Sequence, residues 1–272
     1  MRPASRASLA TARERLDTAT DGLGADELTR LGEELYAVAG FLDRKRGLRR
    51  NLADRGSPEA SRKQLIQRLL EGKIGDRTME AVAEVVTSRW SRPLDLVDAV
   101  EELAGHAIFA VAEGDSSLEE VEDELFKFGR ALDAQPRLAT LLADENRPAD
   151  DRVELLTTLL DGRARPATRT LLEHAVRAPR RRALEGVVDQ LVDRAAARRE
   201  RYVAHVTAAA PLTEEQESRL LDALGRIYRR PISMQAEIDP DLLGGLVIRV
   251  GDEIIDGSLS GRLERARQWL PH

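Results

Sequence analysis

The sequence predicts a mainly α chain: two tandem helical bundles, one a duplicate of the other, followed by a small α/β C-terminal domain. Three observations predict this fold. The sequence repeats itself after 90 residues, apolar residues recur at helical spacing in both copies, and alternating β-branched residues replace that spacing after residue 201. We therefore expect the chain of 272 residues to divide at 1–103, 104–200 and 201–272.

The repeat is visible in an ungapped alignment of 28–97 with 118–187, in which 20 of the 70 positions are identical. An apolar stripe in the first segment has an apolar residue at each equivalent place in the second: Leu28, Leu31, Leu35, Val38 and Leu42 correspond to Leu118, Val121, Leu125, Phe128 and Leu132. Both stripes have the spacing of one helical face. A shared register of this kind is typical of duplication.

Each copy predicts five or six short helices. Gly72 and Gly162 occupy equivalent places, where a glycine would end a helix. Between about 94 and 113, Gly105 is the only residue that disfavours a helix, so the last helix of copy one is expected to continue into the first helix of copy two. Repeats of this size with an apolar face on every helix favour compact bundles.

The tail has a different pattern. Thr213 and Gln216 form a capping box that opens a helix through about 227. Alternating apolar residues predict strands near 202–209, 232–238 and 246–250, with a hairpin continuing to Ile255. A last helix is expected after Ser258. These elements make a small α/β unit of about 70 residues, close to the lower limit for an independent core.

Composition excludes several kinds of site. The chain has no cysteine, and its four histidines are scattered, which argues against a metal site or a cofactor held by such ligands. A net charge of −6 gives no general attraction for nucleic acid. No apolar run is long enough to cross a bilayer, so no transmembrane segment is expected.

No motif points to catalysis. The acidic residues between Glu119 and Glu124 are interpreted as a solvated helix start. The basic run at Arg177, Arg180, Arg181 and Arg182 is interpreted as a helix end and loop, with contact to phosphate or to an acidic stalk as the less favoured interpretations. Gly244–Gly245 lacks the remainder of a phosphate loop. We therefore predict no catalytic, cofactor-binding or metal-binding residues.

Two segments of the tail resemble a known family. The run 238–252, with its glycine pair and following strand, and the run 255–265, which begins Ile-Asp-Gly-Ser, are similar to the signature of the F-type ATP synthase delta subunit, or oligomycin-sensitivity-conferring protein. The segment 105–112 resembles the opening helix of that family, although Ala104 stands where tyrosine is usual. The resemblance covers 104–272 directly and reaches 1–103 only through the repeat. A duplicated helical domain is similar to the actinobacterial type.

The resemblance implies a non-catalytic peripheral-stalk subunit on the cytoplasmic face of the cell membrane. It implies that the helical domain binds the N-terminal helix of an alpha subunit, and that the C-terminal domain binds the b subunits. We expect the alpha helix to contact Ala104, Ala107, Ile108, Val111, Leu171, Leu172 and Val176. The signature positions are assigned structural roles: Gly244, Gly245, Asp256, Gly257, Ser258, Gly261 and Leu263.

Alternatives remain at this point. The duplication alone is also typical of a helical-repeat adaptor protein unrelated to energy coupling. That the protein is an enzyme is the third and least favoured hypothesis. Copy one has three open roles: binding a second alpha N-terminus, packing on the stalk, or lengthening the connection.

Overall fold

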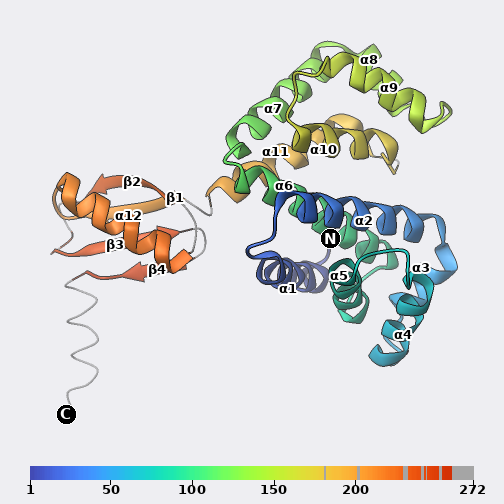
Figure 1. Cartoon of the computed structure of the whole chain (residues 1–272), viewed down its shortest axis with the longest axis horizontal. Coiled ribbons are helices and arrows are strands. Elements are labelled where there is room, and N and C mark those ends of the chain that lie inside the picture. The colour runs from blue at the N-terminus through green and yellow to red at the C-terminus, as the bar shows by residue number, and fades with distance from the viewer. Residues whose placement is uncertain are drawn as a thin grey trace. The chain divides into compact units, whose positions relative to one another are not determined.

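The computed structural model describes residues 1–180, 182–200, 203–228, 232–239, 242, 244–250 and 253–258. Within them it contains twelve helices and one four-stranded sheet (Figure 1). The chain separates into two compact units, Met1–Val192 and Asp193–His272. The mainly helical fold with a small α/β end is therefore as the sequence predicts. Among the described residues, no helix is long and apolar enough to span a membrane.

The first unit begins with six helices, which follow one another through short connections. They are α1 (Pro3–Thr20), α2 (Ala25–Arg44), α3 (Arg46–Leu52), α4 (Glu59–Leu70), α5 (Asp76–Thr87) and α6 (Pro93–Gly114). The apolar stripe of α2 predicted from the repeat is buried, with Leu35 and Leu42 fully inside. Burial of such a side chain contributes about 1.5–3 kcal/mol, so these stripes fix which face of each helix points inward.

Helix α6 joins the two copies without a break. It starts with Pro93, whose missing N–H costs nothing at a helix start, and continues for 22 residues. Thirteen of these residues are buried, so α6 is enclosed on most sides. The sequence correctly predicted that the last helix of copy one continues into the first helix of copy two.

The same succession of helices follows in copy two. The helices are α7 (Leu118–Ala134), α8 (Pro136–Ala143), α9 (Ala149–Leu160), α10 (Pro166–Arg177) and α11 (Leu184–Glu200). Both predicted glycine ends have a left-handed backbone, with φ of 70° at Gly72 and 65° at Gly162. Glycine adopts this conformation without strain, so both helices end at equivalent places.

Buried arginines repeat with the same 90-residue period. Arg62 donates to the carbonyl oxygens of Leu52 and Val86, and Arg152 donates to those of Leu142 and Val176. Each guanidinium satisfies backbone acceptors near the ends of two helices. The repeat therefore extends beyond apolar packing to the polar groups that fix the ends of helices.

Two carboxylates repeat in the same way. Glu34 accepts from the hydroxyl of Thr78 and the backbone N–H of Gly75, at the start of α5. Glu124 accepts from Thr168 and the N–H of Arg165, at the start of α10. A carboxylate at this end of a helix pairs free N–H groups and is favoured by the helix dipole. Glu124 belongs to the acidic cluster of α7, and its bonds give it a structural role there.

The second unit is built on a sheet with strand order β2-β1-β3-β4. Its elements are β1 (Val203–Ala208), α12 (Glu214–Tyr228), β2 (Ser233–Ile238), β3 (Leu246–Val250) and β4 (Glu253–Asp256). Strand β1 pairs in parallel with β2 and antiparallel with β3. A parallel pair needs a crossover, which α12 supplies. Ala204, Val206, Leu224, Ile248 and Val250 are among the buried residues of its core.

The predicted cap of α12 is present. The backbone N–H of Thr213 donates to Oε1 of Gln216 at 2.9 Å, and the N–H of Gln216 donates to the Thr213 hydroxyl at 3.3 Å. These two bonds form the reciprocal capping box. They stabilise the first turn of α12, which follows β1 after a short loop.

The signature glycines turn the chain into β3. Gly244 and Gly245 have φ of 126° and 85°, a conformation that other residues rarely adopt. A Cβ on Gly245 would lie 2.5 Å from the carbonyl oxygen of Gly257. The backbone N–H of Ser258 donates to Asp256 Oδ1 at 2.9 Å. Gly261, Leu263 and the predicted last helix lie outside the described residues.

Candidate partner-binding site

The seven predicted contact residues lie on two helices of the first unit. Four are on α6 and three are on α10. Six of the seven are buried within the chain itself, and the seventh, Val111, is half-buried. The buried six are Ala104, Ala107, Ile108, Leu171, Leu172 and Val176. The structure thus brings the two predicted helices together, and it places most of the predicted side chains in the core.

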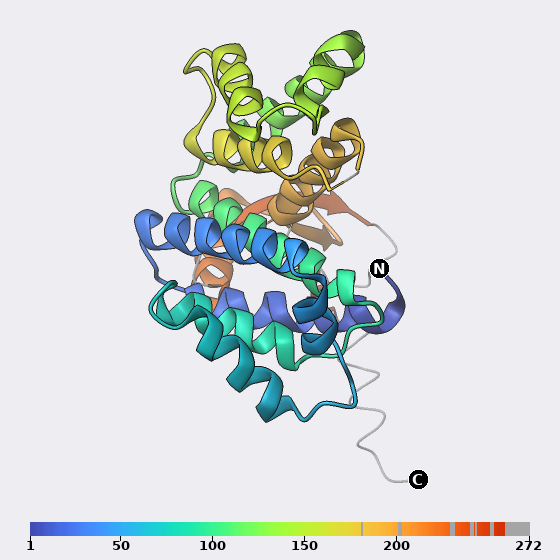
Figure 2. The same ribbon diagram turned by 90° about the vertical axis from the view of Figure 1, so that its right-hand side faces the viewer.

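Helix α2 of copy one covers the predicted face of α6. The two helices pack along much of their length (Figure 2). Gly32 permits the closest approach, because a Cβ there would lie 2.6 Å from Cδ1 of Ile108 and 3.2 Å from the carbonyl oxygen of Ala104. Small residues at a crossing point bring helix backbones near each other. Copy one therefore supplies a helix at the face where a partner helix was predicted.

Helix α2 also contacts α10, through an aromatic stack. The ring of Tyr36 on α2 stacks on His174 of α10, with centroids 3.5 Å apart. Burial, together with the nearby positive charges of Arg182, Arg180 and Arg177, lowers the pKa of His174 to about 3. A neutral imidazole is the form that tolerates both an apolar neighbour and three cations. His174 is therefore uncharged at neutral pH.

Copy one has an equivalent face that this unit leaves open. The groove lies between α1 and α5, with Leu31 of α2 at its base, and encloses about 210 Å³. Ala12, Leu16, Ala19 and Ala81 give it a mostly apolar lining. Because the 90-residue period aligns α1 with 93–110 of α6 and aligns α5 with α10, this groove corresponds to the face that α2 covers in copy two.

Charged groups border this open groove. Arg15 of α1 pairs with Glu84 of α5, and Arg77 donates to the carbonyl oxygen of Ala19 at 2.9 Å. An apolar floor between charged edges is the usual form of a groove that accepts an amphipathic helix. Sequence reasoning did not select these residues, although the 90-residue period, applied backward from 171 on α10, reaches Ala81.

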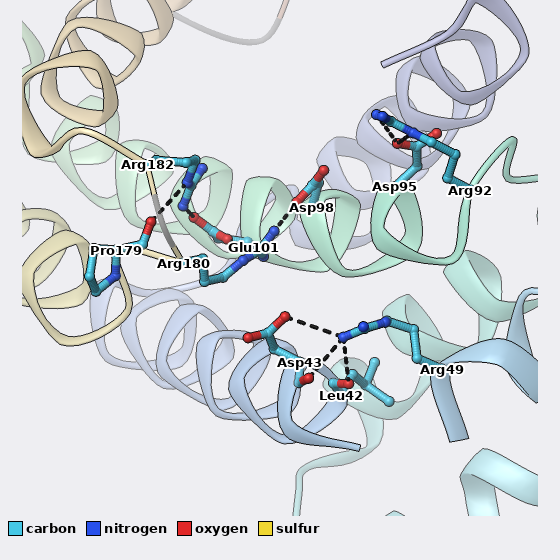
Figure 3. A network of polar contacts seen from close by, with 10 residues as sticks. All are labelled: Leu42, Asp43, Arg49, Arg92, Asp95, Asp98, Glu101, Pro179, Arg180 and Arg182. Atoms are coloured by element: carbon cyan, nitrogen blue, oxygen red, sulfur yellow. Dashed lines mark hydrogen bonds and ion pairs between the residues drawn. The ribbon is translucent and has the colours of Figure 1, made fainter. Parts of the chain in front are cut away.

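The basic run after α10 is held partly within the chain. Arg180 pairs with Asp98 and Glu101 of α6, and Arg182 pairs with Glu101 (Figure 3). Arg177 pairs with Asp150 at 2.6 Å. The predicted interpretation as a helix end and loop agrees with this arrangement for these three residues. Arg181 lies outside the described residues.

Together these features define a class of protein: a helical scaffold with an α/β tail. Most of its predicted partner-binding positions are buried among helices of the same chain. The family model for the ATP synthase delta (OSCP) subunit matches residues 105–270. Because that match spans more than half of the chain, the chain belongs to the ATP synthase delta (OSCP) family.

Relatives match along the whole chain. ATP synthase subunit delta of Streptomyces griseus is 45% identical over 270 residues, which cover 99% of each chain. The Thermobifida fusca protein of the same name is 44% identical over 271 residues, again 99% of each. ATP synthase subunit b-delta of Mycobacterium sp. strain KMS is 44% identical over 271 residues, all of this chain but only 61% of the relative.

A solved structure also resembles the chain. A chain of the Toxoplasma gondii mitochondrial ATP synthase hexamer matches 62% of this chain and 96% of its own length, at 19% identity and a TM-score of 0.32. The identification depends on the family model and on the relatives. As a member of this family, the protein is a structural subunit of the F-type ATP synthase peripheral stalk, peripheral to the membrane complex, and is not itself a catalyst. The alternative of an adaptor unrelated to energy coupling has no support.

Proposed function

We propose that the helical unit of this stalk subunit binds the N-terminal helix of an alpha subunit, and that the C-terminal unit binds the b subunits on the cytoplasmic face of the cell membrane. The same proposal retains 1–103, 104–200 and 201–272 as the functional divisions of the chain. The observation that supports it most directly is the open apolar groove between α1 and α5.

The groove and the covered face offer two places for the alpha helix. At the predicted face, a partner would reach Ala104 and Ile108 only by displacing α2, whose Gly32 packs against them. That displacement would expose buried side chains, at about 1.5–3 kcal/mol for each large one. The α1/α5 groove needs no displacement. We therefore propose the groove as the principal site and retain the α6/α10 residues as the second.

The chain itself illustrates the partner that such a face accepts. Helix α2 packs against α6 through an apolar stripe, and its Gly32 permits a close approach. A partner for the α1/α5 groove should likewise be an amphipathic helix with apolar residues at i, i+3, i+4 and i+7. Its flanking charges would meet Arg77 and Glu80 at the edge of the groove.

The test uses the full-length chain and a synthetic peptide of the alpha N-terminus. Ala19→Arg and Ala81→Arg change groove positions that are exposed and half-buried, respectively, so neither fills the core. Val111→Arg changes the half-buried member of the predicted face. Ala60→Arg, on exposed α4 surface outside the groove, is the matched control.

We expect each groove variant to weaken peptide binding at least about tenfold, because an arginine in an apolar groove leaves a charge poorly solvated. Val111→Arg and the control should retain the original affinity. Loss of binding only in Val111→Arg would move the site to α6 and α10. Unchanged affinity in all the variants, with melting temperatures preserved, would reject both sites.

The proposal for the b subunits has a separate test. Ile254 on β4 and Ile227 on α12 are 65% and 64% exposed, which makes them available for contact. A tagged full-length chain is expected to retain b subunits from solubilised membranes, and Ile254→Asp or Ile227→Asp to reduce their yield. Full retention by the double variant would exclude this surface.

A further inference from the structure

A large charged cavity lies on the first unit, apart from the α1/α5 groove. It has a volume of about 870 Å³ and is bordered by α2, α3, α6, α9, α10 and the segment after α10. Eight arginines and four carboxylates line it. With a neutral His174, the lining carries four excess positive charges, although the whole chain has a net charge of −6. Such a local reversal of sign focuses positive potential in the cavity.

Three of the lining carboxylates are already paired. Asp98 and Glu101 neutralise Arg180 and Arg182, as Figure 3 shows. Asp43 lies 3.3 Å from Nη1 of Arg49, which also donates to the carbonyl oxygen of Asp43 at 2.8 Å. These pairs hold the walls in place and leave the excess charge on other arginines.

Two of the other arginines, Arg92 and Arg177, pair with Asp95 and Asp150, which lie just outside the lining and offset two of the four excess charges. Three arginines face the cavity without a carboxylate. Arg44 and Arg46 are exposed at the junction of α2 and α3, and neither has an ion pair among the described residues. Arg152 is 4% exposed and donates only to carbonyl oxygens within the described part of the chain. Arg49 is 8% exposed, and its Nε has no hydrogen-bond partner.

His174 lies close to three of these arginines. Its ring borders the cavity, and the positive charges of Arg182, Arg180 and Arg177 add to burial in lowering its pKa. Those cations disfavour a further positive charge at this place. An anion bound here would reverse that effect.

We propose that this cavity binds a diphosphate group, either as free pyrophosphate or as part of a nucleoside diphosphate. A guanidinium fork matches the oxygens of a phosphate and binds two of them at once. The volume lies within the range of about 300–1,000 Å³ that is typical of small-molecule sites. An acidic peptide would need an extended groove for its backbone, so we favour the compact anion.

Calorimetric titration of the full-length chain with pyrophosphate tests the proposal, with ADP, AMP and a hexaglutamate peptide as separate ligands. The double variant Arg44→Gln/Arg46→Gln removes the two exposed cavity arginines. Its control, Arg50→Gln/Arg68→Gln, removes two exposed helical arginines that do not line the cavity. Both pairs change the net charge equally, so a general charge effect would appear in both.

We expect pyrophosphate to bind, the cavity variant to weaken binding by about tenfold or more, and the control to change it less than about twofold. Binding should also raise the pKa of His174, measured by NMR of its ring. Similar affinity for ADP and much weaker binding of AMP would identify the diphosphate group as the feature recognised. Absence of pyrophosphate binding at millimolar concentration, equal loss in both variants, or binding of the acidic peptide alone would overturn the proposal.

Discussion

The depressed pKa of His174 predicts that acid destabilises the helical unit, and that a defined part of this loss of stability depends on His174 alone. The perturbation is a change from pH 7.5 to pH 5.0, applied to the original chain and to His174→Phe. Phenylalanine retains an aromatic ring opposite Tyr36, which stacks on His174 at 3.5 Å, and removes the titrating group. The difference between the two chains isolates the histidine from the many carboxylates.

The sign and size of this change in the free energy of unfolding follow from the linkage between folding and proton binding. The pKa of His174 is about 3 in the folded chain and 6.5 as a model value, so between these values the unfolded state binds more protons. Stability therefore falls as the pH falls below about 6.5. At pH 5.0, the unfolded chain lies about 1.5 pH units below its pKa, which corresponds to about 2 kcal/mol at 1.36 kcal/mol per unit.

Urea unfolding followed by Trp90 fluorescence measures this loss. Trp90 is buried in the first unit, and its indole N–H donates to the carbonyl oxygen of Val85 at 2.7 Å, so its emission should change when the helical unit unfolds. Trp269→Phe in every chain leaves Trp90 as the only tryptophan. The original chain should lose about 2 kcal/mol more than His174→Phe between the two pH values. Equal losses would refute a depressed pKa at His174.

Further predictions concern three glycines. Gly32→Leu should destabilise the helical unit by about 1–3 kcal/mol in urea unfolding, because its side chain would meet Ile108 where α2 crosses α6. Gly47→Ala, whose Cβ would meet open space in α3, should be neutral or stabilising by up to about 1 kcal/mol, and equal effects of both variants would contradict close packing. Gly245→Ala should destabilise the second unit by about 2 kcal/mol or more in thermal unfolding, because its Cβ would meet the backbone of Gly257 at a positive φ. An unchanged melting temperature would show that the turn adapts.

The sequence contained enough information for the elements and for their repetition. Apolar spacing predicted the helices, and the presence of only one residue that disfavours a helix, Gly105, between about 94 and 113 predicted the continuous α6. The 90-residue period did not predict the polar contacts between distant helices. Glu34 and Glu124 resemble surface residues of a helix, yet each binds the start of a helix more than forty residues away. Long-range bonds of this kind depend on tertiary placement, which local spacing does not encode.

The candidate site was predicted less completely. The sequence selected α6 and α10, whose apolar residues face one another, because their pattern resembles a partner-binding domain. An apolar stripe has the same appearance whether a partner or another helix of the same chain covers it. Gly32 and Tyr36 show that α2 of the same chain covers the stripe here. Gly32 permits the close approach of α2, and Tyr36 stacks against α10. Neither role can be read from one helix considered alone.

The unbroken backbone of α6 has a mechanical consequence. At a rise of about 1.5 Å per residue, its 22 residues form a rod of about 33 Å that belongs to both copies. A flexible linker between the copies would let each tilt by itself, whereas a sharp bend in this rod would break backbone hydrogen bonds of the helix. A sideways force on copy one must therefore deflect copy two with it. The duplicated region lengthens the stiff part of the subunit and adds no hinge at the junction of the copies.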